Sequence, residues 1–163
     1  MSGAKRLLLL GGITLALLGM TYGLWYAVFA EHQALDGMGG SLAAGFSAAA
    51  GRNPAMAARS LEEYRQAKYD YDRQVDVHGH WIGLAMLLIV LAVGFDRVAF
   101  SEKQKLLLAW TLFLGSGLFP LGVLLQTANH GAAPRALAVL GSVLVIAALA
   151  GITLGLVRRQ IAE

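Results

Sequence analysis

The first apolar block of the chain reads LLLLGGITLALLGMTYGLWYAVFA, from Leu7 to Ala30, and contains no charged residue. A helix needs roughly 20 apolar residues to cross the hydrocarbon core of a bilayer, so this block is long enough to span it. The apolar region of a cleaved signal peptide has only about 7–15 residues. A retained transmembrane helix is therefore the preferred interpretation over a leader that ends at Ala30.

Three further apolar blocks extend this conclusion to the whole chain. The blocks Leu106 to Leu125 and Ala136 to Val157 are each long enough to span. The block Trp81 to Phe95 measures only about 22 Å as a helix, so it spans only if residues 77–80 enter the membrane boundary. We predict an all-α integral membrane protein, a single four-helix bundle. The predicted spans are residues 7–30, 77–98, 104–127 and 136–157, with an outer helical loop over residues 31–76.

The composition excludes several classes of function. Of the 163 residues, 14% are charged, whereas about 25% are charged in a soluble domain. The chain has no cysteine, which excludes disulfides, thiolate metal sites, iron–sulfur clusters and a cysteine nucleophile. The net charge of +3 is dispersed around the apolar blocks, so we expect no nucleic-acid binding. No soluble catalytic motif is present and no charged residue lies at mid-depth in a span, which argues against an enzyme, a pump or an ion-coupled transporter.

The positions of lysine and arginine predict the orientation in the membrane. Seven of the 13 basic residues lie in three short segments on one side of the four spans. Basic residues in such short flanks favour the cytoplasmic side. We expect a bacterial inner-membrane protein with both termini in the cytoplasm and with the long loop in the periplasm. The seven residues are Lys5, Arg6, Arg97, Lys103, Lys105, Arg158 and Arg159.

The outer loop is predicted to be helical with one flexible turn. Gly37 to Gly40 predict this turn, and Ser41 is expected to cap the short helix that follows. Asn53 and Pro54 are typical of a helix N-cap and the first helical position. Because no helix breaker follows, we expect one helix to run from residue 55 into the second span.

One stripe of this outer helix carries Leu61, Tyr64, Lys68 and Tyr71. The functional interpretation is a docking face for a partner subunit. The alternative is that the stripe packs on the top of the bundle or lies in the headgroup layer of the lipid bilayer, where tyrosine is favoured.

Glycine is concentrated in the predicted spans. The pairs Gly19 with Gly23 and Gly151 with Gly155 allow helices to approach closely, and we expect both pairs to pack within the bundle. Pro120 removes one backbone hydrogen bond, so we expect it to bend the third span.

All four histidines lie at the outward ends of the first three predicted spans, at positions 32, 78, 80 and 130. A count from a turn near Ser101 places His78 level with Leu125 and His80 level with Val123. His78 and His80 point about 200° apart, because they are two residues apart on a helix.

Imidazole is a good ligand for haem iron, copper and zinc, and three interpretations follow. Two histidines from different spans suit a haem inside a four-helix bundle. Three histidines, with Glu31 or Asp76, suit a copper or zinc ion at the outer rim. The third interpretation is that all four are ordinary interfacial histidines. The candidate metal ligands are His32, His78, His80 and His130.

The stretch from Val77 to Gly155 resembles a known group of proteins. It begins with His78-Gly-His-Trp-Ile-Gly-Leu-Ala-Met-Leu-Leu-Ile and later contains Leu108-Ala-Trp and Gly115-Ser-Gly-Leu-Phe-Pro-Leu-Gly122. These segments look like small four-helix bacterial membrane proteins that are similar to a fragment of subunit I of haem–copper oxidases. The resemblance implies that His78 or His80 is a haem ligand. The copper-site histidines of the oxidases have no counterpart, so oxygen reduction is not implied.

These patterns together predict a haem-binding membrane protein with an electron-transfer or respiratory accessory role. Haem b would be held on the periplasmic side by His78 or His80 together with His130. One alternative is a structural or assembly subunit without a cofactor, docked through the stripe of Leu61, Tyr64 and Tyr71. The other alternative is a periplasm-facing copper or zinc protein. We expect no catalytic activity of its own.

Overall fold

The computed structural model describes residues 1–162 of the chain, with the side chains of residues 1–159. This range is 92% helical and contains no strand, as predicted. Four stretches are long and apolar enough to cross a membrane, which agrees with the four predicted spans. The elements are α1 (Gly3–Trp25), the π-helix η1 (Tyr26–Ala30), α2 (Glu31–Ala50), α3 (Pro54–Gly94), the 3₁₀ turn η2 (Phe95–Arg97), α4 (Glu102–Ala128) and α5 (Ala132–Ala162).

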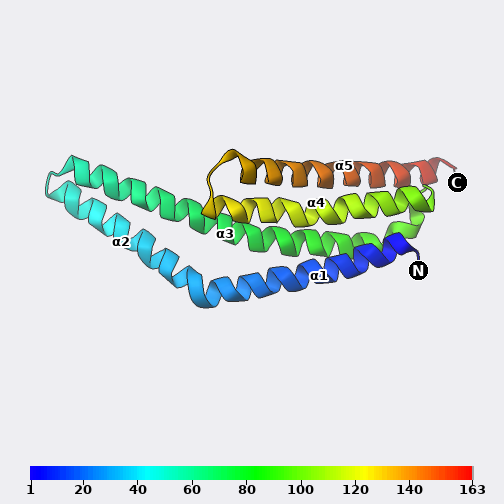
Figure 1. Cartoon of the computed structure of the whole chain (residues 1–163), viewed down its shortest axis with the longest axis horizontal. Helices are drawn as coiled ribbons and strands as arrows, with labels where there is room; N and C mark the ends of the chain where they lie inside the picture. The colour runs from blue at the N-terminus through cyan, green and yellow to red at the C-terminus, as the bar shows by residue number, and fades with distance from the viewer. Residues whose placement is uncertain (163) are drawn as a thin grey trace.

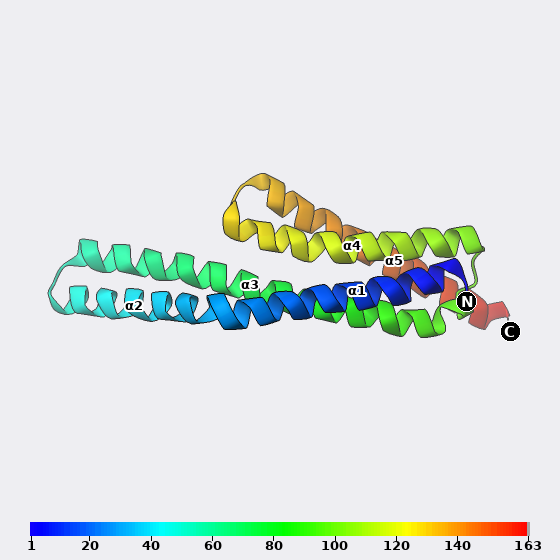
Figure 2. The ribbon, with the colours of Figure 1, turned by 60° about the horizontal axis from the view of Figure 1, so that its bottom comes forward.

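The helices form two antiparallel pairs of unequal length (Figure 1). α1, η1 and α2 form one bent rod, and α3 packs antiparallel to it; we call this pair the hairpin. α4 pairs with α5 beside the half of the hairpin that contains α1. Both chain termini and the turn between α3 and α4 lie at one end, as Figure 2 also shows. α2 and the first half of α3 extend past the loop between α4 and α5. With 20 residues, α2 alone reaches roughly 30 Å.

α3 packs on the rod through residues spaced alternately three and four apart, the spacing of a coiled coil. A Cβ at Gly45 would meet the Cβ of Ser60 at 3.6 Å. The rings of Tyr26 and Tyr71 lie 6.3 Å apart. Every position of this series, on α3 and at the start of η2, is buried or half-buried: Ala57, Ser60, Tyr64, Ala67, Tyr71, Gln74, His78, Trp81, Ala85, Leu88, Ala92 and Phe95.

The π-helix η1 sets which face of α2 meets α3. If regular α-helical spacing continued beyond Tyr22 and Tyr26, the face that contacts α3 would include residues 33, 37, 40, 44 and 47. All five are exposed. A π-turn holds one extra residue, so it shifts the contact face by one position. The half-buried positions of α2 are accordingly Ala34, Met38, Ser41, Gly45 and Ala48, beside Glu31 at its start. The rod bends at the same place in Figure 1.

The turn predicted at Gly37 to Gly40 is wrong, because these residues lie inside α2. The hydroxyl of Ser41 donates to the carbonyl of Gly37 at 2.9 Å, a bond within the helix rather than an N-cap. Glycine disfavours a helix by about 1 kcal/mol relative to alanine. Packing of Met38 and the other half-buried positions against α3 outweighs this local preference.

The start of α3 follows the sequence prediction. The side chain of Asn53 accepts a hydrogen bond from the backbone N–H of Met56 at 3.1 Å, and Pro54 is the first helical residue. The helix then runs without a break to Gly94. It ends four residues before the predicted limit of the second span, since residues 95–97 form the turn η2.

The glycine pairs pack within the bundle, as predicted. A Cβ at Gly19 would meet the Cβ of Trp81 at 3.0 Å, and one at Gly151 would meet a methyl group of Leu108 at 2.7 Å. The crossing of α4 and α5 is tighter, because a Cβ at Gly141 would lie 2.6 Å from the backbone Cα of Phe119. α4 stays helical through Pro120, which is buried; the bend predicted there stays a prediction.

Candidate functional site

His78 and His80 lie on opposite sides of α3, as their spacing predicts. The Nδ1 of His78 lies 2.9 Å from the carbonyl oxygen of Gly19 on α1. The Nδ1 of His80 lies 2.6 Å from the carbonyl oxygen of Asp76 in its own helix. The ring of His80 meets Phe119 of α4 edge-on, with 4.7 Å between the ring centroids.

The depth predicted for His80 is wrong by one helical turn, because its contact is Phe119 instead of Val123. The count assumed that the chain reverses near Ser101. α3 ends at Gly94 and α4 begins at Glu102, so the turn is centred earlier in the sequence. The contact of His80 therefore lies four positions closer to the start of α4 than the count from Ser101 places it.

His130 and His32 lie apart from this pair. The Nε2 of His130 lies 2.9 Å from the side-chain nitrogen of Gln66 and 3.6 Å from the carboxylate of Asp70. His32 has 86% of its side chain exposed, and its Nε2 lies 3.4 Å from the carboxylate of Asp36, one turn along α2.

The structure does not bring two of these imidazoles to one metal. Two nitrogens on one ion lie within roughly 4 Å of each other, because each metal–nitrogen bond is about 2 Å long. Asp70, which contacts His130, is ten residues from His80 on α3, or about 15 Å along the helix. Within residues 1–162 no group of three His, Asp or Glu side chains is placed to hold a metal. His80 and His130 therefore lie apart in this arrangement, and the binding of haem or of a metal ion by the histidines stays a prediction.

Each imidazole of the His78/His80 pair is nevertheless oriented for one bond. A carbonyl oxygen only accepts hydrogen bonds, so Nδ1 carries the proton in both rings. In the neutral rings Nε2 is then a free acceptor. Metal-binding histidines are commonly oriented by such a second hydrogen bond.

A group of polar side chains fastens the outer end of α4 to α3. The hydroxyl of Tyr69 donates to the side-chain oxygen of Gln126 at 3.3 Å, and the amide of Gln126 donates to the carbonyl of Gly122 at 3.2 Å. The guanidinium of Arg73 lies 5.0 Å from the Tyr69 ring centroid. Together with the contact between Gln66 and His130, these contacts form a polar clamp between α3 and the end of α4. Sequence reasoning missed it, although Gln66, Tyr69 and Arg73 share one face of the helix.

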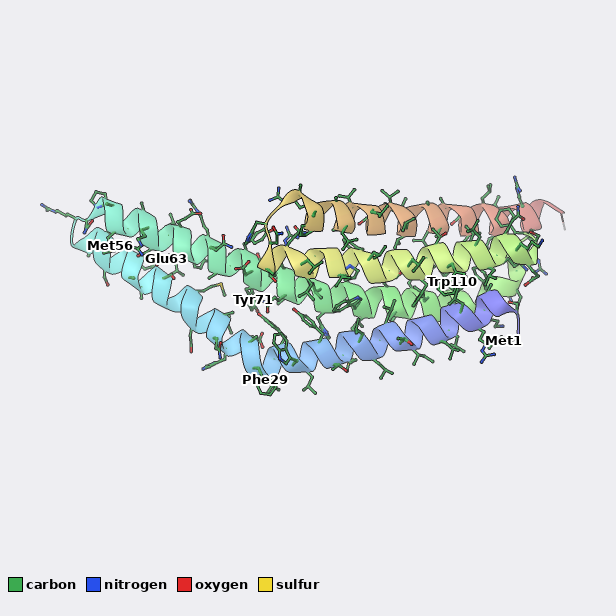
Figure 3. All side chains as sticks on the ribbon, in the orientation of Figure 1. Met1, Phe29, Met56, Glu63, Tyr71 and Trp110 are labelled. Atoms are coloured by element: carbon green, nitrogen blue, oxygen red, sulfur yellow. The ribbon has the colours of Figure 1, made fainter. Side chains whose placement is uncertain are left out.

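Aromatic side chains gather where the rod bends. The ring of Tyr22 meets Trp81 edge-on at 5.6 Å and Tyr26 at 6.4 Å. The hydroxyls of Tyr22 and Tyr26 are buried and have no hydrogen-bond partner among residues 1–159. Phe29 is 65% exposed and lies on the outer side of the bend, away from Tyr71 (Figure 3). Such a belt of exposed and buried aromatic rings is typical of a membrane–water boundary.

The residues of the predicted docking stripe lie in two different environments. Tyr71 contacts Tyr26, and Tyr64 is half-buried in the contact with the rod. The ammonium of Lys68 lies 2.6 Å from the carboxylate of Asp72, a hydrogen bond that raises the pKa of Lys68. Leu61 alone lies on an open apolar surface.

That open surface, the distal surface, lies near the far end of the hairpin. It surrounds a groove of about 230 Å³ between α2 and α3. Phe46 is 74% exposed, Leu61 42% and Leu42 37%. No residue of α2, a helix described in full, is buried, and none from Gly37 to Gly51 is charged. The groove is lined by Ser41, Leu42, Gly45, Phe46, Ala49, Ala57 and Leu61.

The exposed faces of α3 in this hairpin form a charged flank, whose charges are paired along the helix. Arg59 lies 3.0 Å from Glu63, and Arg65 lies 3.3 Å from Glu62. Exposed pairs of this kind contribute only about 0.3–0.5 kcal/mol each to stability. Arg65 lies one helical turn beyond Leu61 on the same face of α3, whereas α2 carries no charged residue from Gly37 to Ala50.

Comparisons of the chain with protein-family models, with curated proteins and with solved structures find no match.

Proposed function

We propose that this protein is a non-catalytic subunit of a bacterial inner-membrane complex and that it docks a partner subunit through the distal surface. Four spans anchor it, and the hairpin of α2 and α3 carries the distal surface into the periplasm. The partner offers an apolar, uncharged surface that accepts Leu42 and Phe46.

The observation that carries this proposal is the character of α2. An exposed helix outside the membrane normally carries charged residues, yet the face of α2 around Leu42 and Phe46 is apolar. Four glycines weaken α2 as an independent helix, at positions 37, 39, 40 and 45, and α3 covers only one of its sides. A large exposed apolar surface rimmed by polar residues is typical of a protein-interaction site.

The charge distribution supports the orientation. The seven basic residues of the short flanks lie at the end that holds both termini and the turn between α3 and α4. The distal surface is at the opposite end, beyond the loop between α4 and α5. Positive flanks favour the cytoplasm, which directs the hairpin outward.

A photo-crosslinking residue in place of Phe46 tests the docking. We expect one adduct of defined mass in intact membranes and none from the same residue at Arg59, which is exposed on the charged flank. Leu42→Glu, combined with the probe at position 46, is expected to reduce the adduct at least about tenfold, because it buries an uncompensated charge at the contact. Purified Leu42→Glu protein should keep its helical content. An adduct that survives Leu42→Glu, or that forms equally at position 59, contradicts the proposal.

Haem binding is the second candidate, and the orientation of His78 and His80 favours it only with a single protein ligand. The docking proposal predicts no Soret band in protein purified from cells supplied with haem. A Soret band that is lost in His78→Ala or His80→Ala but kept in His130→Ala would replace docking with haem binding. His130→Ala is the matched control, because His130 belongs to the polar clamp.

A further inference from the structure

A second groove lies toward the opposite end of the molecule, between the last turns of α3 and the C-terminal half of α5. Val90 and Gly94 line it from α3, and Ile152 and Leu156 line it from α5. Its volume is about 200 Å³. The walls are apolar side chains at the depth where the predicted spans end, so an alkyl chain fits the groove better than water does.

Arg97 is the one charged residue that lines this groove in the described part of the chain. It follows α3 directly, is exposed, and makes no side-chain hydrogen bond or ion pair among residues 1–159. The neighbouring acids are engaged elsewhere. Asp96 lies 2.9 Å from the ammonium of Lys5, and Glu102 lies 3.3 Å from that of Lys105.

An apolar groove with a guanidinium at its edge suits a phospholipid. Arginine binds phosphate oxygens through two parallel N–H donors, and it does so best beside a low-dielectric medium. Basic grooves between transmembrane helices on the cytoplasmic side are typical sites for anionic lipid headgroups. The same end also carries a surplus of positive charge from Lys5, Arg6, Lys103, Lys105, Arg158 and Arg159.

We propose that this groove binds an anionic phospholipid of the cytoplasmic leaflet, with its phosphate on Arg97 and one acyl chain between α3 and α5. The site rests on the membrane insertion and orientation in the proposed function, but it does not depend on the docking of a partner. The acyl chain would fill the space that separates α3 from α5 at this end.

The test uses the full-length protein in nanodiscs of palmitoyloleoyl phosphatidylglycerol and phosphatidylcholine at equal amounts. Native mass spectrometry counts the lipids that stay bound after release. We expect the protein to retain phosphatidylglycerol preferentially, and Arg97→Gln to weaken this retention about tenfold because it removes a charge-assisted pair of hydrogen bonds. Lys103→Gln is the matched control, because it removes the same charge at the same end from a residue that does not line the groove.

Gly94→Leu tests the groove itself. A Cβ at Gly94 would meet no atom within 4 Å, and its φ of −96° suits any residue, so the variant should fold. The leucine side chain is expected to occupy the groove and to abolish selective retention. Full retention in Gly94→Leu, or equal losses in Arg97→Gln and Lys103→Gln, overturns the proposal in favour of diffuse attraction to a basic surface.

Two further outcomes distinguish failure of the lipid site from failure of the proposed function. Displacement of the lipid by inorganic phosphate alone would identify a plain anion site and overturn the role of the acyl chain. Failure of the protein to enter the membrane fraction would contradict the proposed function before any lipid is counted, whereas the crosslink at position 46 reports on docking separately.

Discussion

Gly141→Leu will separate α4 from α5 and lower the free energy of unfolding by about 3 kcal/mol or more. A Cβ at Gly141 would clash with the backbone of Phe119, with its Cα at only 2.6 Å. Backbone atoms cannot rotate away as a flexible side chain does, so the helices must move apart. The contact is reciprocal, because a Cβ at Gly122 would lie 2.7 Å from the Cα of Ala138.

Unfolding of the purified protein in mixed micelles with increasing SDS, followed by circular dichroism, measures this loss. Gly83→Leu is the matched control, since a Cβ at Gly83 would meet nothing within 4 Å on the exposed side of α3. We expect its stability to be unchanged or slightly higher, because leucine favours a helix more than glycine does. Equal losses in the two variants would mean that α4 and α5 do not cross at Gly141.

An alanine inserted after Val28 will disrupt the hairpin, whereas deletion of Val28 will be tolerated. Deletion turns η1 into regular α-helix and leaves Ala34, Met38 and Gly45 facing α3, because η1 contains one residue more than α-helical spacing needs. The insertion adds a second extra residue and rotates α2 by about 100°. Gln33 and Ala44 then replace Ala34 and Gly45 at the contact.

Hydrogen exchange of α2 and the first half of α3 distinguishes the two variants. We expect protection to fall at least about tenfold in the insertion variant, which corresponds to about 1.4 kcal/mol, and to stay near the original value in the deletion variant. α4 and α5 serve as internal controls, because α2 does not contact them extensively. Greater damage from the deletion than from the insertion would contradict the role of η1 in setting the contact face.

Much of the fold follows from local sequence. The apolar blocks locate four spans, and Asn53 with Pro54 marks the start of α3, because a side-chain cap and a missing N–H act within a single turn. Gly37 to Gly40 predict a turn wrongly, because contacts with a distant part of the sequence decide the structure there. Their local preference for a turn is weak, and it is outweighed by contacts with α3, a helix that begins 14 residues later in the chain.

The histidines could be found from sequence, but their surroundings could not. Their grouping at one end follows from the order of spans. Whether they converge depends on helix rotation and on the centre of one turn. An error in that centre changes which residue of α4 lies level with His80. The sequence pattern indicates the distal surface only through Leu61. Leu42 and Phe46 follow glycines that predict a turn, so the pattern does not place them beside Leu61. The π-turn determines which residues of α2 contact α3, and residue spacing alone does not reveal that turn.

The uninterrupted rod from Gly3 to Ala50 has a mechanical consequence. Its 48 residues extend about 70 Å with no loop to absorb displacement. A sideways load on the tip is therefore transmitted as a bending moment along the whole rod. The load is shared with α3, which packs along the rod, and the rod bends at η1, where regular α-helical hydrogen bonding is interrupted. The protein thus contains one continuous rod that couples the distal surface to the end of the molecule that holds Lys5.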